Sequence, residues 1–280
     1  KKSHKRNKTF CPKHFYIPLP EQIKNETIKT IEFKFINDEI KICYNYVYNE
    51  KDTVVTSTIN DSISIDLGVK NLLTIYDPTG NQHIISGKYL LSTNYYFRKK
   101  VGDKQKKKQN YNKLLTKRSN IITNYFNLIV KWMYEKYKHK KMIIIGYNLG
   151  WKNKANLGKD NNFLFNKIPF CQLIDKIKNK FNSNDIIVKL NEESYTSKCD
   201  SLSLEQICKH ETYNGNRTKR GLFGSSIGKY VNADINGAIN IKNKHTNISF
   251  LPFLNIKAAG IRKKVMQIML NPYVPKIDKI

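Results

Sequence analysis

The sequence has few acidic residues and no long apolar run. Its 22 Asp and Glu residues are set against 50 Lys and Arg residues, which leaves a formal net charge of +28. Solubility requires a much smaller excess of positive charge, so this charge favours a polyanionic partner such as nucleic acid. A Lys-rich composition is also typical of AT-rich coding sequence, so codon bias can account for part of the excess. No stretch approaches the roughly 18 consecutive apolar residues of a membrane span, so we expect no membrane partner.

Cysteine is also scarce. The five Cys residues are odd in number, widely spaced and never arranged as a CxxC pair. This usage argues against a disulfide framework and indicates a reducing, intracellular compartment, either nucleus or cytoplasm. Residues 1–8 are strongly basic and have no apolar segment behind them, so we expect a basic tip and no secretory signal peptide.

One stretch, residues 62–76, reads SISIDLGVKNLLTIY. Polar and apolar residues alternate before Asp66, Gly68 permits a tight reversal, and residues 72–76 predict a returning strand. A carboxylate held on a strand is costly to bury without a positive partner, and Mg²⁺ is one such partner. Taken alone, the stretch fits a surface turn better than a metal site, so the decision depends on acidic residues elsewhere.

Strand and helix patterns alternate along the rest of the chain. Period-two alternation predicts a hairpin over residues 31–48, and helical spacing predicts a long amphipathic helix over 111–137. Further elements are expected as strands at 83–85, 142–145 and 185–190, and as helices after Pro169 and over 258–270. Strands that alternate with helices predict an α/β fold.

Two more acidic positions join Asp66. Glu193 follows the strand at 185–190, and Asp234 lies at a strand-to-helix junction or in a first helical turn. This order of carboxylates, on a first strand, a late strand and a last helix, is that of a ribonuclease H-like nuclease site. Such a site holds two Mg²⁺ ions about 4 Å apart. Side chains alternate along a strand, so Glu192 should point away, and we place Glu193 first and Glu192 second.

Five sequence words occur in a fixed order. They are SIDLGVKNL at 64–72, IIIGYNLGWK at 143–152, ESYTSK at 193–198, KRGLF at 219–223 and NADINGAINI at 232–241. Each is weak alone, but together they resemble the TnpB proteins of bacterial insertion sequences and their eukaryotic and viral relatives, the Fanzor proteins.

The resemblance implies a RuvC-type, ribonuclease H-like nuclease domain that cuts DNA, guided by an RNA from the end of the transposable element. It implies Asp66 as the first catalytic carboxylate, bridging two Mg²⁺ ions, with Glu193 and Asp234 each holding one. Most TnpB proteins carry the second acid at the end of the strand that here reads IIIGYN, where this chain has Gly146. Glu193 occupies the place used by Fanzor-like members, just before the YTS word.

Two departures from the family pattern affect the expectations. Family members usually carry a zinc ribbon of two CxxC pairs before the last Asp, whereas this chain has only Cys199, Cys208 and His210 there, so zinc is not expected. Family members also carry an N-terminal recognition domain inside a wedge-shaped β-barrel. Only about 60 residues precede Asp66 here, so we expect a remnant of the wedge barrel that lacks most of the N-terminal portion.

These patterns yield a domain plan. We expect a partial wedge-like β region over 1–60, a RuvC-like domain over 61–195 and 231–250, a basic insert over 196–230 and a C-terminal tail over 251–280. Two basic segments, one interleaved with Tyr95, Tyr96 and Phe97 and one in the insert, are expected to hold phosphates, unless they are ordinary solvated surfaces. Their candidate nucleic-acid-binding residues are Arg98, Lys99, Lys100, Lys106, Lys107, Lys198, Arg217, Lys219 and Arg220.

The sequence leaves three functions open. The first is a Mg²⁺-dependent, RNA-guided DNA endonuclease whose partners are DNA and the element's guide RNA. The second is a catalytically inactive nucleic-acid-binding remnant, which the short N-terminal part favours. The third is a ribonuclease H-fold nuclease that works without a guide.

Overall fold

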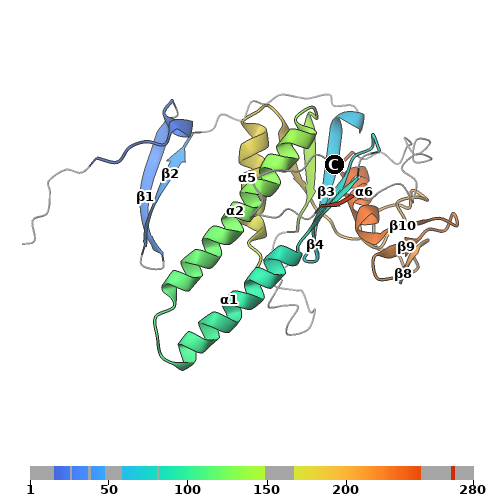
Figure 1. Cartoon of the computed structure of the whole chain (residues 1–280). Coiled ribbons are helices and arrows are strands. Elements are labelled where there is room, and N and C mark those ends of the chain that lie inside the picture. Colours follow the sequence, from blue (N-terminus) through green and yellow to red (C-terminus); the bar gives the residue numbers. More distant parts are fainter. Residues whose placement is uncertain are drawn as a thin grey trace, which may run out of the picture. The chain divides into compact units, whose positions relative to one another are not determined.

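The computed structural model describes residues 16–25, 27–36, 39–47, 59–80, 82–148, 167–246 and 266–268. The chain divides into two compact units, residues 1–53 and 54–280 (Figure 1). Among the described helices, none has the length and apolar content needed to cross a membrane.

The N-terminal unit is built on an antiparallel hairpin. A short 3-10 turn, η1 (Glu21–Ile23), precedes strands β1 (Ile28–Ile36) and β2 (Glu39–Tyr46). Cross-strand pairing gathers the apolar side chains on one face, where the pairs are Ile31 with Tyr44, Phe33 with Ile42, and Phe35 with Ile40. The predicted hairpin is confirmed, while its expected turn at residues 37 and 38 lies outside the described residues.

The second unit is organised around a six-stranded mixed sheet in the order β11-β5-β4-β3-β6-β7. The strands are β3 (Ser62–Leu67), β4 (Asn71–Tyr76), β5 (His83–Ser86), β6 (Met142–Gly146), β7 (Ile187–Asn191) and β11 (Met266–Ile268). The sequentially adjacent strands β3, β4 and β5 pair antiparallel, whereas β3, β6 and β7 run parallel. The predicted α/β class is therefore confirmed as a mixed α/β fold.

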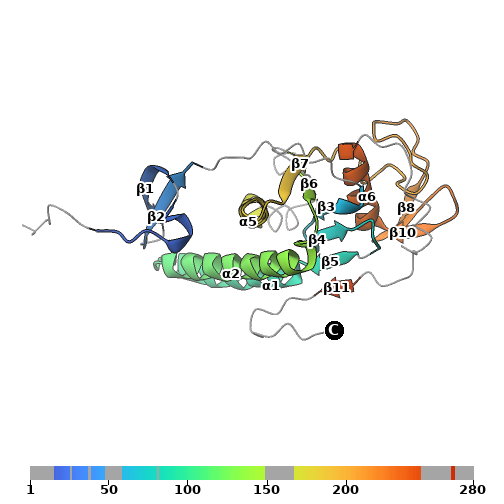
Figure 2. The same ribbon diagram turned by 90° about the horizontal axis from the view of Figure 1, so that it is seen from above.

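Helices cover both faces of this sheet. Figure 2 shows α2 (Asn112–Tyr137) and α5 (Phe170–Asn182) on one side and α6 (Ala233–Thr246) on the other. The apolar residues of α5 recur at helical spacing and are buried, and those of β3, Ile63 and Ile65, meet the same core. The remaining helix, α1 (Lys88–Lys106), follows β5 and pairs with α2.

The alternation of β3 directs its polar side chains toward α6. The Ser64 hydroxyl donates a hydrogen bond of 2.6 Å to the Ala238 carbonyl, and the buried Lys242 ammonium donates to the Ser62 carbonyl. Asp66 is the next residue on that face, because side chains two positions apart on a strand share a face. The sequence pattern therefore places Asp66 between the sheet and α6.

A second, three-stranded antiparallel sheet precedes α6. Its strands, in the order β10-β9-β8, are β8 (Asn216–Lys219), β9 (Leu222–Gly224) and β10 (Tyr230–Asn232). Phe223 and Val231 of this sheet pack in a core cluster with Ile235 and Ala238 of α6. The small sheet is thus anchored against the helix that carries Asp234.

The expected C-terminal helix over residues 258–270 is wrong where the structure describes it. Met266–Ile268 form strand β11, which pairs parallel with β5 along the exposed edge of the sheet. An unpaired edge strand offers backbone donors and acceptors that an extended segment can satisfy. The other residues of the predicted helix lie outside the described residues.

Candidate carboxylate site

Asp66 lies near the end of β3, facing α6 at very close range. A Cβ atom placed on Gly237 would lie 3.1 Å from the Asp66 Oδ2 atom, so any side chain there would require the Asp66 carboxyl to shift by a few tenths of an ångström. Burial raises the pKa of Asp66 well above its usual value, and the negative charges of Glu193 and Asp234 raise it further. The charges of Glu193 and Asp234 therefore both reach Asp66.

Glu193 follows β7 and reaches back to the end of the neighbouring strand β6. A Cβ atom placed on Gly146 would lie 2.9 Å from the Glu193 Oε2 atom. The Glu193 backbone N–H donates a hydrogen bond of 3.0 Å to the Asn148 side chain, which fixes the chain at this turn. The Glu193 carboxyl thus lies beside the strand end where most TnpB proteins carry their acid and this chain carries none.

The surroundings of the Glu193 carboxyl disfavour its charged form. Burial raises its pKa to about 7, with a further contribution from the charge of Glu192. A carboxyl with a pKa this high is half protonated near neutral pH, and a nearby cation would restore its charge.

Glu192, the second choice for this position, has a different environment. Its exposed carboxylate accepts hydrogen bonds from the Lys244 ammonium and from the Ser194 backbone N–H. Partial burial alone would raise the pKa of Glu192, but these hydrogen bonds lower it. Glu192 is therefore paired at the surface, and Glu193 is the acid whose charge acts on Asp66.

Asp234 lies in the first turn of α6, which Asn232 caps by accepting hydrogen bonds from the backbone N–H groups of Asp234 and Ile235. Asn71 donates a hydrogen bond of 2.6 Å to one Asp234 oxygen, and Arg217 lies 3.7 Å from the other. Sequence reasoning missed the contact of Asn71. Its only sequence signal is a polar residue just after the Gly68 reversal.

The three carboxylates can be judged as ligands for a divalent cation by their chemistry and by their arrangement. Carboxylate oxygens are the ligands that Mg²⁺ prefers, so Asp66, Glu193 and Asp234 fit such an ion in kind. Within the part of the chain that the structure describes, however, no three Asp, Glu, His or Cys side chains are arranged so that they could hold one ion. The three carboxyl groups would have to turn toward one another to bind it.

The predicted basic insert contains a hydrogen-bonded core. The carboxylate of Asp200, which is 0% exposed, accepts hydrogen bonds from the Ser225 hydroxyl at 2.7 Å and the Ser226 backbone N–H at 2.9 Å. Glu205 accepts from the backbone N–H groups of Asp200 and Asn214. These two acids join the turns at either end of the insert, which sequence reasoning treated as a loop.

The three residues left at the zinc-ribbon position lie close together. The Cys208 Sγ atom is 3.3 Å from His210 Nε2, and the Cys199 Sγ atom points toward the Gln206 carbonyl at 3.5 Å. His210 Nε2 also lies 2.7 Å from the Gln206 carbonyl. Cys199, Cys208 and His210 therefore each contact another protein group through their sulfur or nitrogen atoms.

The predicted phosphate-binding residues of α1 lie on the protein surface. Arg98, Lys99, Lys100, Lys106 and Lys107 are all exposed, as are the interleaved Tyr95 and Tyr96. Phe97, expected to offer a stacking face beside them, is only 3% exposed, because it belongs to the apolar side of α1. That expectation is wrong for Phe97.

The basic residues of the insert are also exposed, but they have different neighbours. The Lys198 ammonium lies 5.7 Å from the ring centroid of Tyr213, and Lys219 and Arg220 sit where β8 turns toward β9. Arg217 is exposed as well, but its guanidinium lies 3.7 Å from the Asp234 carboxylate, so it borders the carboxylate region.

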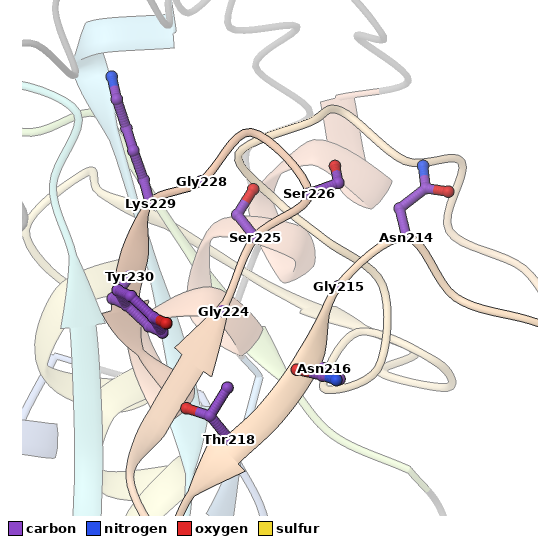
Figure 3. A pocket seen from close by; sticks show the side chains of 10 residues that line it. All are labelled: Asn214, Gly215, Asn216, Thr218, Gly224, Ser225, Ser226, Gly228, Lys229 and Tyr230. Carbon is purple, nitrogen blue, oxygen red and sulfur yellow. The ribbon is translucent and has the colours of Figure 1, made fainter.

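The opposite face of the small sheet lines a cavity of about 230 Å³ (Figure 3). Asn216 and Thr218 of β8 face it together with Tyr230, and a Cβ atom on Gly224 would contact all three of these side chains. Strand β8 thus presents Arg217 toward Asp234, and it presents Asn216 and Thr218, the residues on either side of Arg217, toward this cavity.

The fold and site define a mixed α/β protein in which two carboxylates from distant parts of the chain, Glu193 and Asp234, act on a third, Asp66. Residues 45–147 match the family model OrfB_IS605, described as a probable transposase, and residues 170–241 match the Cas12f1-like TNB domain. Both matches support the resemblance to TnpB-like proteins that the five sequence words indicate. No curated protein matches it.

Two solved structures are similar to this chain at 18% identity. A Cas12f1–sgRNA–target DNA complex aligns over 77% of this chain and 56% of its own, with a TM-score of 0.49. A CRISPR–Cas12f ternary complex aligns over 72% of this chain and 42% of its own, with a TM-score of 0.47. This chain therefore spans about half the length of these proteins.

Proposed function

We propose that this protein is a metal-dependent nuclease with a ribonuclease H-like domain, which hydrolyses phosphodiester bonds in DNA. The observation that carries the proposal is the electrostatic effect of Glu193 and Asp234 on the pKa of Asp66. A protein gains no stability by gathering half-buried like charges, so their proximity points to a cationic ligand. The mixed sheet, with an antiparallel β3–β4–β5 part joined to parallel β6 and β7, is the framework such a domain uses.

The three carboxylates would divide the work of holding two Mg²⁺ ions, with Asp66 between them and Glu193 and Asp234 on either side. Bound Mg²⁺ supplies an activated water and stabilises charge on the leaving 3′ oxygen. Asp66 and Glu193 must lose their protons before they coordinate a cation, because their pKa values are raised in its absence. Asn71 fixes one oxygen of Asp234, which leaves the carboxylate oriented from the first turn of α6.

The proposed partners are DNA and a guide RNA. The formal charge of +28 supports a polyanionic partner, and the exposed cations of α1 supply one surface for it. The resemblance to TnpB-like proteins, with its two family-model matches, supports guidance by RNA. The division of residues 61–280 into nuclease domain, insert and tail remains part of this proposal.

A catalytically inactive nucleic-acid-binding protein is the second candidate. Two observations favour it: Arg217 lies 3.7 Å from Asp234, and no described trio of side chains is arranged to hold a metal ion. An arginine beside a carboxylate can neutralise the charge that a metal ion would otherwise balance. The same Arg217 would contact a DNA phosphate in the active form.

The two candidates differ in a cleavage assay. The protein is incubated with labelled DNA and Mg²⁺, with and without RNA transcribed from the flank of its own coding sequence. We expect RNA-dependent cleavage that Asp66→Asn and Glu193→Gln abolish, while Glu192→Gln, the adjacent and surface-paired acid, retains it. Binding without any metal-dependent cleavage would support the inactive protein, and cleavage that ignores RNA would support a guide-independent nuclease.

A further inference from the structure

A second cationic site lies away from the carboxylates, where the start of α5 meets α2. A cavity of about 260 Å³ is lined by Arg118, Ser119 and Ile122 of α2 and by Lys167, Pro169 and Gln172 at the start of α5. None of the lining side chains is acidic. Its described lining therefore combines two cationic side chains with hydroxyl and amide groups.

The guanidinium of Arg118 is fixed at the edge of this cavity. Its Nε and Nη2 atoms donate hydrogen bonds of 2.9 and 2.6 Å to the Asn94 side-chain oxygen, and Nη2 also donates to the Lys167 carbonyl at 2.7 Å. Asn94 is only 2% exposed, so it cannot swing away. The plane of the guanidinium is thereby set by α1, α2 and the segment that precedes α5.

This fixed cation has no carboxylate partner within the described residues. All three of its hydrogen bonds go to neutral oxygens, and the Nη1 nitrogen makes none of them. Burial lowers the pKa of Arg118, with no opposing contribution from an acid. A partly buried charge without a counter-ion is costly, and a guanidinium held in place in advance suits a bidentate oxyanion.

Neighbouring features strengthen the positive potential at this site. Helix α5 begins at Phe170, directly after Pro169, so its positive end lies beside the cavity. On α1, Arg98 lies four residues after Asn94, and residues at this spacing share one helix face.

We propose that this cavity binds one backbone phosphate of a nucleic-acid strand, with the Arg118 guanidinium as its principal donor and Asn94 as the residue that positions it. The inference rests on the proposed nucleic-acid binding but not on cleavage, because the cavity is separate from the three carboxylates proposed for catalysis. A free phosphate ion offers the same oxygens, so the experiment must distinguish the two sources.

The test is the salt dependence of binding by the full-length chain. A fluorescein-labelled single-stranded DNA is titrated in EDTA, and its dissociation constant is measured by fluorescence anisotropy over a series of KCl concentrations. Loss of one phosphate contact reduces the slope of log K against log salt by about 0.7 and weakens binding by about fivefold near 0.1 M salt. We expect this result for Arg118→Ala.

Two further variants separate charge from structure. Lys117→Ala removes an exposed cation from the adjacent position of α2 and should leave the slope unchanged. Arg118→Lys retains the charge but loses the planar fork, so it should keep the slope and bind more weakly than wild type. It also serves as the test if Arg118→Ala does not fold.

The outcomes discriminate clearly. A wild-type slope in Arg118→Ala, accompanied by a lower melting temperature, would make the residue structural and overturn the inference while leaving nucleic-acid binding intact. Failure of the wild-type chain to bind DNA would overturn both. If inorganic phosphate, compared with KCl at equal ionic strength, binds wild type but not Arg118→Ala, while both bind DNA with the same affinity and slope, the site takes free phosphate, and the inferred backbone contact is refuted.

Discussion

The buried carboxylate of Asp200 should be the main cross-link of the insert, in the region where relatives carry a zinc ribbon. Its two oxygens accept hydrogen bonds from Ser225 and Ser226 on one side and from the backbone of Leu202 on the other. Burial alone would raise the pKa of Asp200, but these donors hold it below its usual value. The charged form is therefore the one that stabilises the fold.

The substitution Asp200→Asn tests this role with almost no change in volume. One amide nitrogen replaces an acceptor oxygen, so a buried N–H or hydroxyl on one side loses its partner. Hydrogen bonds to charged groups contribute about 1.5–3 kcal/mol each, and an unsatisfied buried donor adds a similar cost. We expect the free energy of unfolding to fall by about 4 kcal/mol, which is a melting temperature lower by roughly 10 °C for a unit of this size.

Thermal unfolding followed by circular dichroism measures this loss. Glu211→Gln, an exposed acid in the same insert, is the matched control and should melt with wild type. The pKa of Asp200 is depressed on folding, so its stabilisation is present above the unfolded value of 3.8 and disappears as the pH falls through the folded value. The deficit of Asp200→Asn should therefore shrink in acid.

EDTA should leave the wild-type melting temperature unchanged, because carboxylate hydrogen bonds rather than zinc join the insert. The reasoning is refuted if Asp200→Asn melts within about 2 °C of wild type at neutral pH, which corresponds to less than about 1 kcal/mol. A large drop of the wild-type melting temperature in EDTA would instead indicate a structural metal at Cys199, Cys208 and His210.

Three further predictions concern the carboxylate region. Gly146→Ala would place a Cβ atom 2.9 Å from the Glu193 carboxyl, so it should lower the cleavage rate by at least about tenfold, which is about 1.4 kcal/mol of activation free energy. The control is Gly102→Ala on α1, where a Cβ atom would enter open space, and it should retain full activity. The raised pKa of Glu193 means that its proton stabilises the metal-free fold and that this stability is lost as pH rises from 4.5 toward 7. Glu193→Gln should then raise the free energy of unfolding by about 2 kcal/mol near pH 8 and change it little near pH 4. Equal effects at the two pH values would contradict a raised pKa of Glu193. Asn71→Ala frees one oxygen of Asp234, so it should reduce cleavage without abolishing DNA binding by anisotropy, and an unchanged rate would remove Asn71 from the site.

Much of the main fold could be predicted from the sequence because its elements carry strong local patterns. The alternation around Asp66 and the Gly68 reversal specify the β3–β4 hairpin. The Gly68 backbone N–H closes its turn by donating a hydrogen bond of 3.2 Å to the Leu72 carbonyl. The amphipathic spacing of α2 and α5 and the apolar run of β6 likewise depend on residues close in sequence. Each of these predictions is confirmed.

The features that sequence reasoning missed depend on contacts between distant segments. Strand β8 reads NRTK and is fully exposed, so it has no apolar alternation to reveal it. Asp200 looks like any loop acid, and only the approach of Ser225 shows its role. Phe97 lies within a basic stretch, yet the orientation of α1 turns it into the core.

The close approach of Glu193 to Gly146 has a consequence for how inactive relatives are recognised. A column-by-column comparison of sequences would count this protein as lacking an acid at the end of β6 and could dismiss it as defunct. In three dimensions the adjacent strand delivers a carboxyl group to the vacated place, and the missing side chain is what gives it room. Under the proposed role of Glu193, the ligand would come from the strand beside the one that carries it in most TnpB proteins, yet from the same end of β6 in space.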